Sequence, residues 1–533
     1  MDQEQQNLES FLRWASKLGI SDSSSNNQSQ HSLSSCLGSS LCVSHFPHSG
    51  GRGLGAVRDL RKGEIVLRVP KSAFMTREAV MEDKKLCVAV NRNSFLSPVQ
   101  MLIVCLLYEM GKGRTSRWHP YLMHLPHTYE VLAMFGEFEK RALQVDEAIW
   151  VTEKAILKAK SEWKEARALM EDLMSKPQFL TFKAWVWAAA TISSRTLHIP
   201  WDEAGCLCPV GDLFNYDAPG EEPSGVEDLE HLLSNASVAD SIILNGDKNI
   251  MHDAEQIDPH FQRLTDGGFE EDMNAYCFYA RTNYKKGDQA VILDGIFILV
   301  KKNLGEGNYF VSRLGHAIAL GGLLTMVLLC YGTYTNLELL EYYGFLLQEN
   351  PNEKVFIPLE PAVYSSTSWS KESLYILPNG KPSFALLTAL RMWATPQNKR
   401  RSVGHLVYSG SQLSADNEIF IMKWLSKTCD AVLKNLPTSI EEDALLLNAM
   451  NNSQDFFTFT ELTKLISLRD EIYAFLEEHN VKDSHNFMDI ILTRKARRCM
   501  DRWKLAVQWR LKYKKILVGC ISFCNDILNS FMK

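Results

Sequence analysis

Apolar side chains recur at helical spacing over several long segments, and this pattern predicts a helix-rich chain. The first segment, residues 5–19, places its apolar side chains on one face and ends at Gly19. Ser97 and Pro98 are the start signals of a second helix, which we expect to end at Gly111. The same spacing predicts further helices at residues 137–176, 182–195 and most of 351–533.

Strand patterns are shorter and lie in the first 300 residues of the chain. Residues 56–70 predict two strands joined by a turn at Arg61-Lys62-Gly63-Glu64, and this hairpin follows a glycine-rich loop at residues 50–55. Additional strands are predicted at residues 275–282 and 289–293.

Three segments lie between the predicted helices and strands and match neither pattern. Residues 21–49 are polar without any period and predict a flexible loop, and residues 219–270 predict an acidic surface excursion. Residues 294–327 are apolar at both ends, and we interpret them as an insert with the character of translated intervening sequence. The apolar run at residues 317–332 falls short of the roughly 20 residues that a membrane span needs, so we expect no span.

Composition and charge narrow the class of protein. Of 533 residues, 46% are hydrophobic and 23% are charged, which is typical of a globular protein with two or three domains. The net charge of −6 gives no overall attraction to nucleic acid or anionic lipid. The acidic start at residues 1–4 lacks the features of a secretory signal or transit peptide. We therefore expect an intracellular monomer, in the cytoplasm or nucleus rather than the chloroplast.

The 12 cysteines are scattered, which predicts reduced thiols. Cys206 with Cys208, and Cys520 with Cys524, are too sparse for a four-ligand zinc site. We expect them to be packing residues, and we expect no metal.

The basic segment at residues 494–515 has two interpretations. Its Arg and Lys residues are interleaved with Trp503, Trp509 and Tyr513, as in a helix that binds nucleic acid or an acidic partner. We favour an amphipathic helix that packs these aromatics inward and solvates its charges.

The stretch at residues 209–217 carries candidate chemistry. Asp212 and Asn215 need polar partners, although Leu213 and Phe214 between them need a core. The Asn215 amide offers both a donor and an acceptor, which suits a polar ligand in an apolar cleft. A capped turn between two elements explains the same pattern equally well.

Four segments, taken in order, resemble one family. They are Gly51-Arg52-Gly53-Leu54 with residues 59–64, Ser194-Arg195, Asp212-Leu213-Phe214-Asn215-Tyr216, and residues 331–345 from Tyr331-Gly332 to Tyr343-Gly344-Phe345. This ordered set resembles the SET-domain methyltransferases of the Rubisco large-subunit lysine methyltransferase type, which include plant proteins. The resemblance covers most of residues 5–533.

The resemblance implies an α+β fold with several parts. A knotted SET core of small sheets would occupy residues 50–350, with a helical insertion at about residues 90–195. An all-helical substrate-binding domain would occupy residues 351–533, and residues 1–49 would precede the core. The insert at residues 294–327 has no counterpart in the family.

The resemblance also implies S-adenosylmethionine as cofactor and a lysine-bearing protein as substrate. Tyr331 would lie at the methyl-transfer point, and Tyr343 would line the lysine channel. Arg195 would lie near the cofactor carboxylate or at the substrate rim. The residues implied at the cofactor are Gly51, Arg52, Gly53, Leu54, Arg195, Asp212, Asn215, Tyr216 and Tyr331.

These roles suit the chemistry of lysine methylation. Forming the neutral amine of an exposed lysine at pH 7 costs about 4–5 kcal/mol. A neighbouring sulfonium and an apolar aromatic channel both lower the pKa of that amine. The remaining requirement is alignment, so Tyr331 would orient the amine while Tyr343 confines it and excludes water.

Two departures from the family pattern keep alternatives open. Tyr216 stands where the family usually has His, so a side-chain contact there would change. Residues 294–327 precede Tyr331 and must either loop out completely or displace it, which puts the activity of this chain in question. The alternatives are methylation of histidine, as in a related branch that acts on actin, and a binding module without catalysis.

Overall fold

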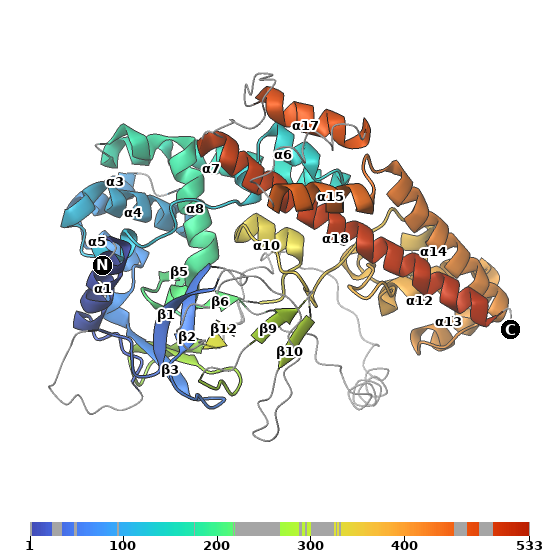
Figure 1. The fold of residues 1–533 in the computed structure, drawn as a ribbon, viewed down its shortest axis with the longest axis horizontal. Coiled ribbons are helices and arrows are strands. Elements are labelled where there is room, and N and C mark those ends of the chain that lie inside the picture. The colour runs from blue at the N-terminus through green and yellow to red at the C-terminus, as the bar shows by residue number, and fades with distance from the viewer. Residues whose placement is uncertain are drawn as a thin grey trace, which may run out of the picture. The chain divides into compact units, whose positions relative to one another are not determined.

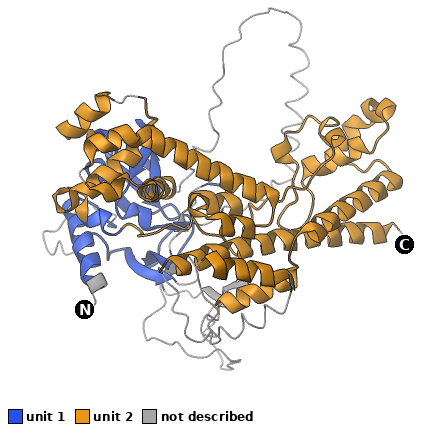
Figure 2. Cartoon of the chain, turned by 90° about the horizontal axis from the view of Figure 1, so that it is seen from above, with its two compact units in different colours: residues 1–80, 120–124, 195–333 blue, residues 81–119, 125–194, 334–533 orange. Residues whose placement is uncertain are grey.

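The computed structural model describes fourteen stretches of the chain (Figure 1). They are residues 3–23, 35–46, 51–92, 95–174, 176–216, 218, 267–286, 290–293, 296–299, 325–326, 328–329, 332–451, 466–478 and 494–531. The chain divides into two compact units, coloured separately in Figure 2. Unit 1 comprises residues 1–80, 120–124 and 195–333, and unit 2 comprises residues 81–119, 125–194 and 334–533.

Unit 1 is built from sheets of two or three short strands. Its described elements are α1 (Gln3–Lys17), β1 (Leu41–Phe46), β2 (Gly51–Ala56), β3 (Ile65–Pro70), α2 (Arg77–Met81, whose last residue enters unit 2), β4 (Thr196–Ile199), β5 (Asp202–Leu207), β6 (Asn215–Tyr216), β7 (Gly267–Glu270), β8 (Ala275–Tyr279), β9 (Ala290–Leu293), β10 (Ile296–Leu299), β11 (Thr325–Met326) and β12 (Leu328–Leu329). The strand orders are β1-β2-β11 and β3-β8-β7, with the pairs β4-β5, β9-β10 and β6-β12. The β6-β12 pair is parallel.

The glycine-rich segment is a strand rather than a loop. β2 pairs with β1 and β11, whereas β3 pairs with β8, so the predicted hairpin over residues 56–70 was wrong. The local turn signal is real, because Gly63 has φ of +80°. Pairing with a distant strand decides the topology instead: Gly63 N donates to Ala280 O, and Ala280 N donates to Glu64 O.

The prediction of a flexible loop over residues 21–49 was wrong for its last part, which forms β1. The buried Asp22 carboxylate explains the difference. Its Oδ2 accepts hydrogen bonds from the backbone N–H groups of Gly38, Ser40 and Leu41 at 2.7–2.9 Å. This anchor joins residues far apart in the sequence, so no periodic pattern signals it.

Part of the insert joins the sheets of unit 1. Most of residues 294–327 lie outside the described residues, but β10 and β11 belong to the insert. Thr325 and Met326 pair with Ala56 and Gly55 of β2. The insert therefore does not loop out completely, because its C-terminal end extends the β1-β2 sheet.

Unit 2 is helical in all its described regular elements apart from the short 3-10 turns. They are α3 (Lys84–Arg92), α4 (Pro98–Lys112), α5 (His119–Leu122, which runs into unit 1), α6 (Glu137–Ala142), α7 (Asp146–Leu173), α8 (Phe182–Arg195), α10 (Asn336–Tyr342), α11 (Pro361–Tyr364), α12 (Phe384–Trp393), α13 (Arg400–Tyr408), α14 (Ala415–Asn435), α15 (Ile440–Asn451), α17 (Ile466–Glu478) and α18 (Arg494–Ser530). None of the helices that the structure describes is long and apolar enough to cross a membrane.

The locally signalled helices are confirmed. α1 ends shortly before Gly19, which has φ of +83°. α4 begins at the predicted cap, where Ser97 Oγ accepts from Gln100 N and Gln100 Oε1 accepts from Ser97 N. It ends at Gly113 rather than Gly111, because Gly113 is the residue with positive φ, at +58°.

Helix α18 is the central element of unit 2, packing against α14, α15 and α6. Trp503, Trp509 and Tyr513 are buried, as predicted. The expectation that this helix solvates its charges was wrong for Arg510 and Lys514, which are 0% and 1% exposed. Arg510 binds Asp443 and Glu471, and Lys514 binds Asp443 at 2.6 Å. Opposite charges within the core therefore replace solvent around this part of α18.

Candidate active site

Four of the predicted cofactor residues lie on β2 in unit 1, and two lie on β6. Gly53 of β2 and Asn215 of β6 face each other closely: a Cβ at position 53 would lie 2.5 Å from Asn215 Nδ2. Glycine is required here by space, since the carboxamide occupies the volume of the missing side chain. Leu54 is fully buried and pairs with Val43 of β1, so its side chain is part of the hydrophobic core.

The Arg52 side chain ties β2 to the segment at residues 120–124. Its guanidinium donates to the carbonyl of His124 and lies 3.4 Å from His124 Nδ1. The His124 ring stacks on Phe11 of α1 at 4.8 Å, and His124 Nε2 lies 3.0 Å from the Asn7 carbonyl. Gly51, at φ of +80°, precedes Arg52 in a conformation that favours glycine.

Asp212 is the buried anion of the site. Its Oδ2 accepts from Arg195 Nη1 at 3.0 Å and from Tyr121 Oη at 2.9 Å, and its carbonyl also accepts from Arg195. The side chain is 2% exposed. Asp212 Oδ1 is buried and has no hydrogen-bond partner among the described residues. A buried acceptor of this kind can receive an N–H or O–H group from a ligand.

The backbone that positions Asp212 is held in an uncommon conformation. Val210, a fully buried β-branched residue, has φ of +70°. The 3-10 turn at Gly211–Leu213 follows it, and Asp212 N donates to the Cys208 carbonyl. A Cβ at Gly211 would lie 2.5 Å from Phe278 Cζ, so tight packing maintains this turn.

Tyr216 reaches the backbone that follows Tyr331. Its phenol donates to the Gly332 carbonyl at 2.8 Å. In the parallel β6-β12 pair, Asn215 is opposite Leu328 and Tyr216 is opposite Leu329. Tyr331 itself lies outside the described residues. The segments on both sides of Tyr331 therefore lie against the Asn215-Tyr216 motif.

Tyr343 belongs to unit 2, where it lies in an aromatic group. Its ring centroid is 5.4 Å from that of Tyr334 and 6.0 Å from that of Phe345. The preceding carbonyl, of Tyr342, accepts from Ser193 Oγ at 2.7 Å. The end of α8 thus fixes the backbone beside Tyr343.

The structure brings four of the predicted residues of unit 1 into two contacting pairs. Gly53 contacts Asn215, and Asp212 binds Arg195. Tyr121 and His124, which bind Asp212 and Arg52, were missed by sequence analysis. No spacing signal relates residues 120–124 to the motifs, because the contacts span long separations in the chain.

The four cysteines expected to be packing residues are all buried. Burial raises the pKa of the Cys206 and Cys208 thiols, which favours the neutral form. Within the described part of the chain, no group of three or more His, Cys, Asp or Glu residues is placed to hold a metal ion.

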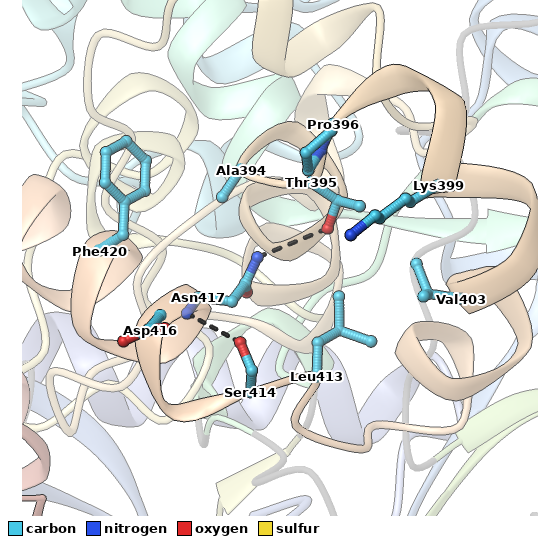
Figure 3. Close-up of a pocket in the computed structure, with 10 residues that line it drawn as sticks. All are labelled: Ala394, Thr395, Pro396, Lys399, Val403, Leu413, Ser414, Asp416, Asn417 and Phe420. Carbon is cyan, nitrogen blue, oxygen red and sulfur yellow. Dashed lines mark hydrogen bonds between the residues drawn. The ribbon is translucent and has the colours of Figure 1, made fainter.

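A cavity of about 400 Å³ lies in unit 2, between the end of α12 and the start of α14 (Figure 3). Its polar lining includes Lys399, Asp416 and Asn417, and Asn417 Nδ2 donates to Thr395 Oγ1 at 3.5 Å. None of its lining residues is a predicted cofactor or catalytic residue. This cavity is therefore separate from the predicted chemistry.

Comparisons with known proteins identify similar sequences and folds. Residues 346–517 match the family model described as Rubisco LSMT substrate-binding. Protein SET DOMAIN GROUP 40 of Arabidopsis thaliana is 49% identical over 540 residues, covering 100% of this chain and 98% of that protein. An actin-histidine N-methyltransferase of Mus musculus is 21% identical, over 74% of this chain and 59% of that protein. A crystal structure of the SET domain of LSMT bound to MeLysine and AdoHcy matches with a TM-score of 0.52 and 17% identity, covering 98% of this chain and 92% of that one.

Proposed function

Because the chain belongs to the SET-domain family of S-adenosylmethionine-dependent protein methyltransferases of the Rubisco large-subunit methyltransferase type, we propose that it methylates a lysine side chain of a protein. The observation that carries the proposal is the parallel pairing of β12 with β6. It brings the strand leading to Tyr331 beside Asn215 and Tyr216. Methyl transfer requires the cofactor motif and the catalytic tyrosine to lie close together.

The residues of unit 1 fit the cofactor. S-adenosylmethionine supplies, when bound, a methyl group activated by its sulfonium. The buried Asp212 Oδ1 offers an acceptor for a ligand amine or hydroxyl. The Asn215 carboxamide beside Gly53 offers a donor and an acceptor. We propose that Gly51–Leu54, Arg195, Asp212, Asn215, Tyr216 and Tyr331 form this site.

In the proposed mechanism, the chain prepares the lysine rather than attacking it. Tyr331 orients the neutral amine through its phenol, and an apolar setting lowers the pKa of that amine. Tyr343, grouped with Tyr334 and Phe345, confines the amine and excludes water. The catalytic contribution is therefore alignment and desolvation.

We propose that the protein substrate is recognised by residues 346–517, which match a substrate-binding family model. Histidine methylation is the second candidate, since a relative with that activity aligns over 74% of the chain. The neighbour whose crystal structure contains methyllysine and AdoHcy supports lysine.

Labelled S-adenosylmethionine tests the proposal. The purified chain is incubated with plant cell extract, and labelled protein bands are hydrolysed to amino acids. Methyllysine is the expected product, and methylhistidine in its place would refute lysine as the target. Cofactor binding without any transfer would indicate a binding module.

Tyr331→Phe tests the catalytic residue. Loss of one positioned hydrogen bond is expected to lower the transfer rate at least about 100-fold, with unchanged binding of S-adenosylhomocysteine. Tyr279→Phe, which alters a half-buried tyrosine of β8 outside residues 346–517, is the control. Undiminished labelling by Tyr331→Phe would remove Tyr331 from the mechanism.

A further inference from the structure

The side chain of Tyr216 connects two segments that are distant in the sequence. Tyr216 is 8% exposed, and its phenol donates to the carbonyl of Gly332 at 2.8 Å in a buried setting. Gly332 directly follows Tyr331 in the chain. The hydrogen bond thus fixes the peptide group on the C-terminal side of residue 332.

Gly332 adopts a backbone conformation that favours glycine. Its φ of +138° lies in the region that favours glycine, and glycine has the greatest backbone freedom of any residue. In the described part of the β6-β12 pair, Leu329 is opposite Tyr216. The phenol therefore adds a side-chain contact between β6 and Gly332 to the described backbone pairs.

We propose that Tyr216 is a positioning residue for methyl transfer: its backbone belongs to the proposed cofactor site, whereas its phenol holds the backbone at Gly332, the residue after Tyr331. This inference rests on the proposed function. A displacement of about 1 Å of a reacting group can lower a rate about a hundredfold. Fixing the Gly332 carbonyl limits such displacement.

Unit 1 contains a matched control. The phenol of Tyr276, a residue that is 1% exposed, also donates to a glycine carbonyl, that of Gly267 at 3.3 Å. This second bond lies within the β7-β8 pair. Tyr216→Phe and Tyr276→Phe remove the same hydroxyl group from the same kind of bond, so their comparison separates positioning from general stability.

Hydrogen exchange measures the proposed hold without requiring activity. In the full-length chain, Tyr216→Phe is expected to speed amide exchange at least about tenfold in the peptide covering residues 328–335, while Tyr276→Phe leaves that peptide unchanged. Equal exchange in wild type and Tyr216→Phe would overturn the inference. This result stands even if the wild type transfers no methyl group.

Kinetics and binding then separate positioning from cofactor binding. Tyr216→Phe is expected to lower kcat at least about tenfold while the Kd for S-adenosylhomocysteine changes less than about twofold. A Kd that rises in proportion to the lost kcat/KM would make the Tyr216 phenol a cofactor contact and refute the proposed positioning role. Gly332→Ala, which disturbs the same peptide from the other side, is expected to show the same pattern. If both variants keep full kcat, the positioning role is excluded.

Discussion

The carboxamide of Asn215 occupies the space that a side chain on Gly53 would fill, with Nδ2 only 2.5 Å from the place of a Cβ. This contact joins the first and third motifs of the sequence through steric fit. It also means that the Asn215 carboxamide must shift if residue 53 gains a methyl group.

We expect Gly53→Ala to displace Asn215 and weaken binding of S-adenosylhomocysteine by about 5- to 150-fold, because overpacking costs about 1–3 kcal/mol. Titration calorimetry measures the affinity. Gly268→Ala is the control, since a Cβ there meets nothing within 4 Å. Equal affinities in Gly53→Ala and the wild type would show that Asn215 can move without loss.

The buried carboxyl group of Glu353 should make the free energy of unfolding depend on pH. Burial raises its pKa from 4.5 to about 7, although hydrogen bonds from Asn336 oppose the shift. The carboxyl group therefore favours folding most below pH 4.5, and this contribution is lost as the pH rises to about 7. The expected loss is about 3 kcal/mol of unfolding free energy.

Denaturant titrations from pH 4 to pH 8 measure this dependence. In Glu353→Gln the residue no longer titrates, so stability should fall less over the same range. Glu349→Gln, at a neighbouring exposed glutamate, should retain the wild-type dependence. If Glu353→Gln falls as steeply as the wild type, another group is responsible.

Asp443 holds two buried cations in unit 2. It binds Arg510 at 2.7 Å and Lys514 at 2.6 Å, and all three side chains are at most 1% exposed. We expect Asp443→Asn to lower the free energy of unfolding by about 3–5 kcal/mol, because the buried Lys514 ammonium loses its carboxylate and Arg510 keeps only Glu471.

The exposed pair of Asp430 and Lys434, with side chains 47% and 72% exposed, provides the control. Asp430→Asn should change the unfolding free energy by less than about 0.5 kcal/mol. Similar shifts of the urea midpoint in both variants would mean that burial does not strengthen the Asp443 network.

Gly344 lies beside Tyr343 in a conformation that only glycine adopts easily. Its φ is +79°, and a Cβ would lie 3.0 Å from the Glu130 backbone. We expect Gly344→Ala to destabilise the protein by about 1–3 kcal/mol. Thermal unfolding measures the change.

Gly404→Ala should shift the unfolding temperature in the opposite direction. Gly404 lies inside α13, and a Cβ there meets nothing within 4 Å. Alanine in a helix interior stabilises by roughly 0.5–1 kcal/mol relative to glycine. Two variants with shifts of the same sign would contradict the steric explanation at Gly344.

Helices could be predicted because their signals are local. Ser97 and Pro98 mark the start of α4 within a few residues of the hydrogen bonds they make. The predicted range of residues 182–195 coincides with α8 for the same reason.

Strand pairing could not be predicted from local patterns. β2 pairs with β11 and β6 pairs with β12, and each pair is separated by more than a hundred residues of chain. The turn at Gly63 was recognised, but its flanking strands belong to different sheets. Local chemistry sets a turn, whereas tertiary packing chooses the partner strand.

Sequence analysis predicted the motifs of the candidate site but not the residues that bind the motif side chains. Asp212 and Asn215 stood out because polar side chains in an apolar run need partners. Tyr121 and His124 carry no such signal, since their roles arise only from contacts with distant residues. The burial of Lys514 was missed because a basic helix face normally meets water.

Residues that contact each other in unit 2 can lie far apart in the sequence, and this affects the order in which they are synthesised. Lys514 meets Gln144, at the junction of α6 and α7, across 370 residues of sequence. At about 5–20 residues per second, roughly 20–70 s pass between the appearance of these two residues on the ribosome. During that interval Phe138 has no Trp503 to pack against, so the side of α6 that carries Phe138 leaves the tunnel without its partner on α18. Completion of this core therefore waits for the last helix to be translated.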